Sequence, residues 1–446
     1  MKKSIVILLL ASLTAAAAPY HIDPLFGYYR NRSPESVASE LQVNGVEEVW
    51  YFAVTPEACR RDLIDALHAH DIRVVLTLFP SWVYLNEKQL DHYLPANWRD
   101  WRMEFTNPVA KQDHIFIGYV YPEYNLWYRN YVVNLLKEYH FDGVAMIETM
   151  YPCYRGDRYK PILMGDVSKG FEKAFGEPLP EFLNDSSPRY FKTDTGRFER
   201  YLAFRTRTIN DFYKYVMDGV RAECPGVTVV SWALGVSTPD GEAEIRRWNG
   251  SDTFSLVRAV KPDMHMVQTH WPDWSSPELK PDYILQYQPF AEAARRGCPG
   301  VRVSFQGDCG SLPEMRRSPE WVAENLALAA GVFDHSVYYE FSLRDEVYSL
   351  PPVLKKHSIS GDSVILVFDQ RLGADSVRAM LNRSDVKDAK ADGNILTVAF
   401  ENGPPPSLDI GGICDDPSSR LPLSRQAPKP YGRVNAIPAG TVVNIR

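Results

Sequence analysis

Three carboxylates stand where apolar runs of the sequence end. Glu148 closes the run GVAMIE, Asp308 closes VRVSFQGD, and Glu340 lies within SVYYEFSL. A charged group at the end of an apolar run is costly to bury unless it faces a site or a partner. Two such groups that face one another can divide acid and base work, one giving a proton while the other attacks or activates water. Asp273, in HWPDW, is a weaker candidate of the same kind.

Neutral polar groups and aromatic rings gather near the same run ends. Aromatic residues make up 12% of the chain, with 25 Tyr and 10 Trp, and many lie in segments that are otherwise polar. Sugars stack their C–H faces on such rings, and their hydroxyls need polar groups beside them. Although most aromatic residues in a chain belong to its core, this combination favours a carbohydrate ligand. The residues predicted to contact it are Tyr29, Trp82, Tyr151, Trp232, His270 and Gln306.

The two patterns together predict cleavage of a glycosidic bond, which requires a pair of carboxyl groups. One protonates the leaving oxygen and the other attacks or activates water, with about 5–5.5 Å between them for retention and about 6.5–9.5 Å for inversion. Glu148 is the strongest candidate, and Asp308 is favoured over Glu340 as its partner. The reason is that Asp308 follows a Gln and a Gly in a turn that lets the backbone approach a ligand. This chemistry needs no cofactor and no metal ion.

Repeated βα units are needed to position these residues. Short apolar runs alternate with helical patterns about eight times between Tyr20 and Leu343, which is typical of the α/β class and of a parallel sheet closed into a (β/α)8 barrel. In such barrels the active site forms at the carboxyl ends of the strands. The predicted strands are YHIDPLFGYY, VEEVWYFAV, IRVVLTLF, GVAMIE, VTVVSWAL, DMHMVQTHW, VRVSFQGD and SVYYEFSL.

Some polar residues are expected away from that mouth. Asp142, in the turn before the fourth strand, is predicted to be a turn or capping residue at the opposite end of the barrel. His21 and Asp23 are placed at the start of the first strand, pointing away from the mouth, so a metal pair is not favoured there. Two long insertions, 80–123 and 149–198, are expected to shape the site, because loops of this length are usually functional.

The chain divides into three predicted parts: residues 1–18, 19–345 and 346–446. Lys2 and Lys3 precede the apolar run IVILLLASL and a small-residue stretch that ends near Ala18, which is typical of a secretory signal peptide. The mature protein is expected to be secreted or periplasmic, without stable membrane insertion, since no second long apolar run follows. From about Ser349, short apolar runs alternate with turn residues, which predicts a small all-β, sandwich-like domain with Ig-like patterning.

The composition argues against several other classes of protein. A net charge of −7, from 49 basic and 56 acidic residues, and the lack of a basic run disfavour a nucleic acid partner. No HExxH, P-loop, dinucleotide GxGxxG or GxSxG pattern occurs. The six cysteines form no CxxC pair, but one or two disulfides are compatible with export, and Cys153 and Cys309 are the pair considered.

The segment LWYRNYVVNLLKEYHFDGVAMIE resembles the helix, turn and fourth strand of secreted TIM-barrel glycoside hydrolases and of the hydrolase-like families related to them. The resemblance implies an exported hydrolase of O-glycosyl bonds that acts on an oligosaccharide or glycoconjugate, with a catalytic role for Glu148. Ile147 precedes Glu148 where related families with an acid/base on this strand have Asn, and many others have Asp there as nucleophile. The role of Glu148 therefore stays open between acid/base and nucleophile.

Two alternatives use the same scaffold, since a fold alone does not set function. One is a catalytically silent barrel that binds glycans with its aromatic cleft but lacks a working carboxylate pair. The other is a polysaccharide deacetylase or lyase, which predicts a metal cluster or a Tyr/His pair in the mouth rather than two facing carboxylates.

Overall fold

The computed structural model describes residues 19–30, 32–103, 115–151, 165–308, 315–343, 350–416 and 434–445. The predicted signal peptide and the pairing of Cys153 with Cys309 lie outside these ranges, as does the predicted domain boundary at 345/346. Within them, no helix is both long enough and apolar enough to cross a membrane.

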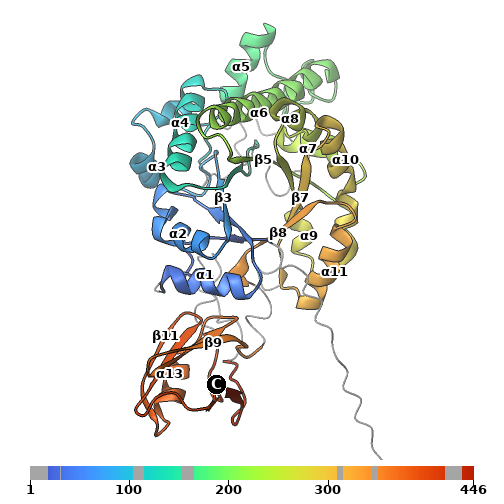
Figure 1. Ribbon diagram of the computed structural model, residues 1–446. Helices are drawn as coiled ribbons and strands as arrows, with labels where there is room; N and C mark the ends of the chain where they lie inside the picture. The colour runs from blue at the N-terminus through green and yellow to red at the C-terminus, as the bar shows by residue number, and fades with distance from the viewer. Residues whose placement is uncertain are drawn as a thin grey trace, which may run out of the picture.

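Eight parallel strands form a closed barrel in which the strand order follows the sequence order (Figure 1). β1 pairs with both β2 and β8, which closes the ring. Most strand residues are buried, as expected for a sheet covered by helices, and this explains their continuous apolar sequences. The predicted barrel is confirmed. Its strands are β1 (Tyr20–Ile22), β2 (Glu48–Phe52), β3 (Arg73–Leu78), β4 (Gly143–Met146), β5 (Thr228–Leu234), β6 (Met264–Gln268), β7 (Arg302–Asp308) and β8 (His335–Tyr339).

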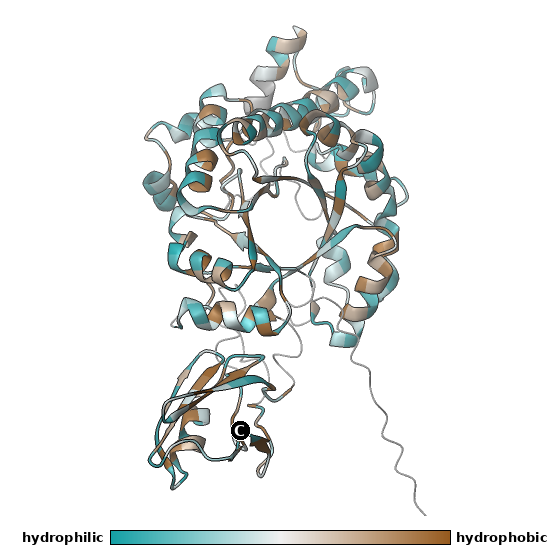
Figure 2. Cartoon of the chain, viewed as in Figure 1, coloured by the Kyte–Doolittle hydropathy of each residue, from teal (hydrophilic) through white to brown (hydrophobic). Residues whose placement is uncertain are grey.

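Helices surround the barrel and alternate between teal and brown along their turns in Figure 2, as amphipathic helices do when one face packs on a sheet. α1 begins after Ser33, because the Ser33 side chain accepts a hydrogen bond from the Ser36 amide and Pro34 occupies the first turn. The α-helices are α1 (Pro34–Val43), α2 (Arg61–Ala69), α4 (Pro122–Tyr139), α6 (Thr195–Glu223), α7 (Gly241–Asn249), α8 (Thr253–Val260), α9 (Trp271–Trp274), α10 (Gln288–Gly297) and α11 (Pro319–Ala329). Short 3-10 helices are η1 (Pro56–Ala58), η3 (Pro281–Tyr287) and η5 (Phe341–Leu343).

Both predicted insertions contain further helices. α3 (Glu87–Tyr93) and η2 (Trp98–Trp101) lie between β3 and α4, and α5 (Gly165–Phe175) lies between β4 and α6. A capping box starts α3: the Asn86 side chain accepts a hydrogen bond from the Gln89 amide, and the Gln89 side chain accepts one from the Asn86 amide. This cap orders the chain beside Tyr84, which lines the cavity described below.

The first strand is shorter than predicted. It ends at Ile22, and Pro24 follows, so the chain turns instead of extending the ladder. Backbone hydrogen bonds from Phe26 to Asp23 and from Tyr29 to Phe26, at 2.9 and 3.0 Å, form successive turns. The expectation that Asp23 starts the strand and points away from the mouth was therefore wrong, because Asp23 stands directly after the carboxyl end of β1.

The C-terminal domain is built on a four-stranded antiparallel sheet in the order β11-β12-β10-β9, with a separate ribbon of β13 and β14. Its core joins Leu366, Val398 and Phe400 of the sheet to Met380 of α13. The predicted antiparallel β domain is confirmed, with one helix that its sequence pattern did not reveal, and the Ig-like resemblance stays a prediction. The elements are β9 (Leu354–Ser360), β10 (Ser363–Phe368), α13 (Ala374–Leu381), β11 (Val386–Asp392), β12 (Ile395–Phe400), β13 (Ser407–Asp409) and β14 (Val442–Asn444).

Candidate active site

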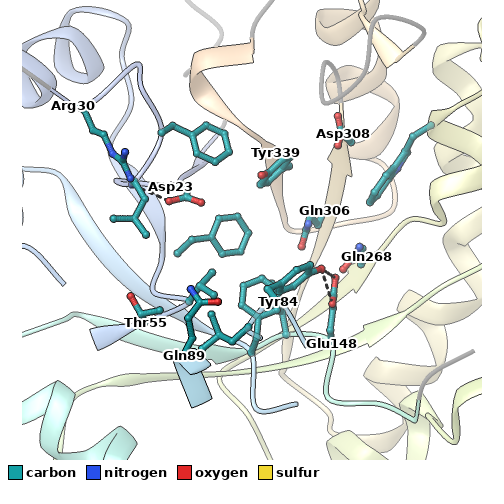
Figure 3. A pocket seen from close by; sticks show the side chains of 18 residues that line it. Asp23, Arg30, Thr55, Tyr84, Gln89, Glu148, Gln268, Gln306, Asp308 and Tyr339 are labelled. Carbon is teal, nitrogen blue, oxygen red and sulfur yellow. Dashed lines mark hydrogen bonds between the residues drawn. The ribbon is translucent and has the colours of Figure 1, made fainter. Parts of the chain in front are cut away.

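A cavity of about 610 Å³ opens at the carboxyl ends of the barrel strands (Figure 3). Its lining residues end or follow β1, β2, β3, β4, β6, β7 and β8. The volume lies within the range of about 300–1,000 Å³ that is usual for small-molecule sites. The aromatic lining residues are Phe26, Phe52, Phe79, Tyr84, Trp274 and Tyr339. The other polar lining residues are Asp23, Arg30, Thr55, Gln89, Glu148, Gln268, Gln306 and Asp308.

Glu148 directs its carboxyl group into this cavity. It lies two residues after β4 with a backbone φ of 51°, a left-handed conformation that costs a non-glycine residue about 1–2 kcal/mol. The Tyr84 hydroxyl lies 2.9 Å from each carboxylate oxygen. Withdrawal from water raises the pKa of Glu148 to about 7, and the hydrogen bond from Tyr84 acts in the opposite direction. A carboxyl group with this pKa is suited to giving a proton at neutral pH.

Replacing Tyr84 by Phe is expected to raise the pKa of Glu148 above its value in the wild type. The phenol stabilises the ionised carboxylate, so without it the proton is held to higher pH. The measurement is a titration of the Glu148 side chain by ¹³C NMR in Tyr84→Phe and in the wild type. Tyr215→Phe, which changes an exposed tyrosine on α6, is the control. An unchanged or lower pKa in Tyr84→Phe would contradict this role.

Asp308 and two glutamines form the wall beside Glu148. Asp308 ends β7 and is buried, and Gln306 lies two residues earlier on the same strand. Gln268 ends β6, and its side-chain oxygen accepts a hydrogen bond of 3.0 Å from the Trp232 indole. Figure 3 shows Asp308, Gln306, Gln268 and Glu148 on one side of the cavity. This wall therefore combines a second carboxylate with neutral hydrogen-bonding groups.

Asp23 and Arg30 form the opposite wall (Figure 3). Burial raises the pKa of Asp23 to about 6, while a hydrogen bond of 2.9 Å from the Leu25 amide and the positive charge of Arg30 lower it. Arg30 is exposed at the rim of the cavity. A carboxylate and a guanidinium side by side accept and donate hydrogen bonds, which suits a hydroxylated ligand.

The architecture can be compared with known proteins. No protein-family model and no curated protein sequence matches this chain. Among solved structures, the glycoside hydrolase domain of PgaB (BpsB) from Bordetella bronchiseptica matches with a TM-score of 0.52 at 11% identity, over 72% of this chain and 93% of that one. The β-galactosidase of the psychrophilic Marinomonas ef1 matches with a TM-score of 0.50 at 12% identity. This chain has the barrel fold of glycoside hydrolases.

A second β-galactosidase, from the Antarctic haloarchaeon Halorubrum lacusprofundi, matches with a TM-score of 0.50 at 12% identity. This chain covers 53% of the length of the Marinomonas enzyme and 52% of the Halorubrum enzyme, while 72% and 73% of its own length is matched. The predicted resemblance to TIM-barrel glycoside hydrolases is thus confirmed at the level of the fold. The fold alone does not determine the activity, which depends on the residues of the site.

Glu340 is not among the residues that line the cavity, and its catalytic role stays a prediction. It is fully buried, and its carboxylate accepts hydrogen bonds from the Asp23 amide at 2.8 Å, the Tyr29 hydroxyl at 2.8 Å and the Ser342 amide at 2.6 Å. Burial raises its pKa to about 7, against the effect of these bonds. Glu340 and Tyr29 therefore support the chain where β1 ends.

Glu340→Ala is expected to lower the free energy of unfolding by about 3 kcal/mol or more, because three buried donors lose their acceptor. The measurement is urea unfolding followed by circular dichroism at pH 6. Glu138→Ala, which changes an exposed residue of α4, should stay within about 0.5 kcal/mol of the wild type. An equal free energy of unfolding in Glu340→Ala and the wild type would contradict this structural role of Glu340.

Four other residues predicted to contact a ligand lie outside the lining of the cavity. The Trp82 indole is buried and donates to the Tyr124 hydroxyl at 3.2 Å. Tyr151 is buried under the Arg205 guanidinium, which lies 4.8 Å from its ring, and Trp232 is buried in β5. The His270 ring precedes α9 and lies 5.8 Å from that of Trp248. The weaker candidate Asp273 accepts from the Ser237 and Tyr287 hydroxyls.

Residues close to them in the sequence line the cavity instead. Tyr84 lies two residues after Trp82, and Trp274 directly follows Asp273. Asp23 also lines the cavity, although the sequence pattern predicted that it lies at the opposite end of β1. Its signal was the Asp23-Pro24 step, because a proline after three strand residues removes a donor that a longer ladder needs.

Two polar residues of the barrel, Asp142 and His21, lie outside the lining of the cavity. Asp142 lies at the opposite end, as predicted, where it accepts from the Val74 amide at 2.7 Å. His21 is buried inside the barrel, its ring stacked at 4.6 Å on that of Phe52, and burial lowers its pKa to about 3. Among the residues that the structure describes, no group of three or more His, Cys, Asp or Glu side chains is arranged to hold a metal ion.

Proposed function

We propose that the protein hydrolyses a glycosidic bond, with Glu148 as the proton donor and Asp308 as the second carboxylate. One observation carries this proposal: Glu148, with a pKa of about 7, shares a cavity at the mouth of the barrel with a second strand-end carboxylate. Glu148 would protonate the leaving oxygen while Asp308 attacks the anomeric carbon or activates a water molecule. The Tyr84 hydroxyl holds the Glu148 carboxyl in place for that transfer.

The rest of the cavity suits a sugar. The rings of Phe52, Phe79 and Trp274 offer apolar faces for stacking, and the amides of Gln268 and Gln306 offer both donors and acceptors for hydroxyls. An oligosaccharide or glycoconjugate is therefore the proposed substrate class. We also propose that the enzyme acts after export, in the periplasm or outside the cell, which rests on the signal-peptide pattern of residues 1–18.

The test is hydrolysis of a panel of aryl glycosides and of host and plant glycans by the purified protein, with the released sugars identified by mass spectrometry. We expect release from at least one member by the wild type and by Glu138→Gln, and none by Glu148→Gln. Thermal-shift measurements with the same panel distinguish the competing function. Binding of a glycan by the wild type without any hydrolysis would point to a silent glycan-binding barrel and overturn the proposal.

A further inference from the structure

We infer that the C-terminal domain positions one wall of the cavity through Arg371. The β1–α1 segment, residues 23–30 with 32 and 33, runs from the end of β1 to the start of α1. It supplies Asp23 and Arg30 to the cavity, together with Leu25 and Phe26. On its outer side it contacts the C-terminal domain, which lies beside α1 in Figure 1. The domain is thus proposed to be part of the construction of the site.

The central contact is made by the Arg371 side chain. Its Nη1 donates hydrogen bonds of 3.0 Å to the carbonyl oxygens of both Gly27 and Tyr28. Its Nε lies 3.4 Å from a carboxylate oxygen of Asp416, which belongs to the same domain. A guanidinium held by a carboxylate of its own domain presents its remaining donors in a fixed direction. These donors hold the two carbonyls that stand between Phe26 and Arg30 in the chain.

A second set of contacts anchors the end of the same segment. The Arg32 guanidinium is buried, with Nη1 2.6 Å from Glu40 of α1 and Nη2 3.1 Å from the Asn394 side-chain oxygen. The Ser33 amide donates to the Asp392 carboxylate at 2.9 Å. Because buried charged groups require partners in good geometry, this network defines one arrangement of the two domains.

The turn at Gly393 shows how closely the two domains fit. Gly393 has a φ of 56°, and a Cβ atom added there would lie 2.1 Å from the Ser36 hydroxyl oxygen and 2.2 Å from Arg32 Nε. Only glycine gives both that conformation and that approach. The C-terminal domain is therefore seated against the β1–α1 segment, whereas a freely tethered module would leave this segment exposed.

The wall is consequently held from two sides. Glu340 accepts a hydrogen bond from the Asp23 amide, and Arg371 holds the carbonyls of Gly27 and Tyr28 from the C-terminal domain. Loss of the Arg371 contacts should free the segment that carries Arg30, while Glu148, which follows β4, and Asp308, which ends β7, keep their place. The expected effect is weaker substrate binding with little change in the chemical step.

The first test needs no substrate. Hydrogen–deuterium exchange of the full chain is compared for the wild type and Arg371→Ala, and we expect amides within residues 24–30 to exchange about tenfold faster or more in the variant. Amides of residues 48–58, which form another wall of the cavity, should not change. Arg378→Ala, an exposed arginine on α13 of the same domain, is the matched control. Unchanged exchange at 24–30 would overturn the inference.

Arg371→Lys keeps the charge and a donor, so its exchange at residues 24–30 should fall between those of the wild type and Arg371→Ala. If Arg371→Ala does not fold, Arg371→Lys replaces it in this test. Exchange at residues 24–30 that equals the wild type in Arg371→Lys would then contradict the positioning role of Arg371.

The second test rests on the proposed function: KM should rise about tenfold or more in Arg371→Ala, with kcat within about threefold. Absence of any wild-type hydrolysis would remove the proposed function and leave the exchange result to decide the inference.

Discussion

Glu148→Gln is expected to lower kcat/KM by about 10³-fold or more on glycosides whose leaving group is another sugar, and by about tenfold or less on 2,4-dinitrophenyl glycosides. A sugar alkoxide leaves slowly unless Glu148 protonates it, whereas dinitrophenolate departs without a proton. The carboxamide keeps the shape of the side chain and its contact with the Tyr84 hydroxyl, so folding should be retained. Steady-state kinetics on both substrate classes measure the difference.

The pH dependence gives the same assignment a second readout. With a pKa of about 7, Glu148 is protonated below that pH and loses its proton above it, so kcat/KM of the wild type should fall as pH rises through about 7. On dinitrophenyl glycosides, which do not need that proton, neither the wild type nor Glu148→Gln should show this alkaline limb. Equal losses of kcat/KM on both substrate classes would instead assign Glu148 as the nucleophile.

Asp308→Asn is expected to lower kcat by about 10³-fold on both substrate classes, because attack on the anomeric carbon is needed whatever the leaving group. Asp23→Asn, on the opposite wall, should mainly raise KM, since the Asp23–Arg30 side is proposed to bind substrate. The measurement is the same pair of assays, with Asp211→Asn, an exposed residue of α6, as the control.

The reverse pattern, with a uniform loss of kcat in Asp23→Asn and a KM effect in Asp308→Asn, would transfer the role of second carboxylate to Asp23. The anomer that is released first, observed by ¹H NMR, then reports whether that carboxylate acts as nucleophile or as base. A retained configuration indicates a covalent intermediate, and an inverted one indicates direct attack by water.

The barrel and one side of the site follow from local patterns in the sequence. Strands buried on both faces need continuous apolar sequences, and the helices between them need amphipathic sequences. The βα alternation can therefore be predicted from short segments of the sequence. Parallel strands in a barrel also bring their carboxyl ends to one mouth. Glu148, Gln306 and Asp308, which end or follow such runs, could therefore be predicted to lie together, and all three line the cavity.

Which of two neighbouring side chains faces the cavity depends on contacts that a local pattern does not reveal. Successive residues of an extended chain point in opposite directions, so a shift of one residue exchanges a lining group for a buried one. Tyr339 lines the cavity, while Glu340, the next residue, is fully buried and not part of its lining. Trp82 and Tyr84 lie in the turns after β3, where strand alternation does not apply, so the sequence pattern could not distinguish them.

The opposite wall depended on contacts between distant parts of the chain. Asp23 is placed by the early end of β1 and by Glu340, which is 317 residues away in the sequence. Gly27 and Tyr28 are held by Arg371, which belongs to the other domain. Such contacts consist of a few hydrogen bonds between single residues. They therefore impose no hydrophobic periodicity on either segment that could be recognised in the sequence. Local pattern therefore predicts the strands, and the pairing of distant polar groups determines the wall.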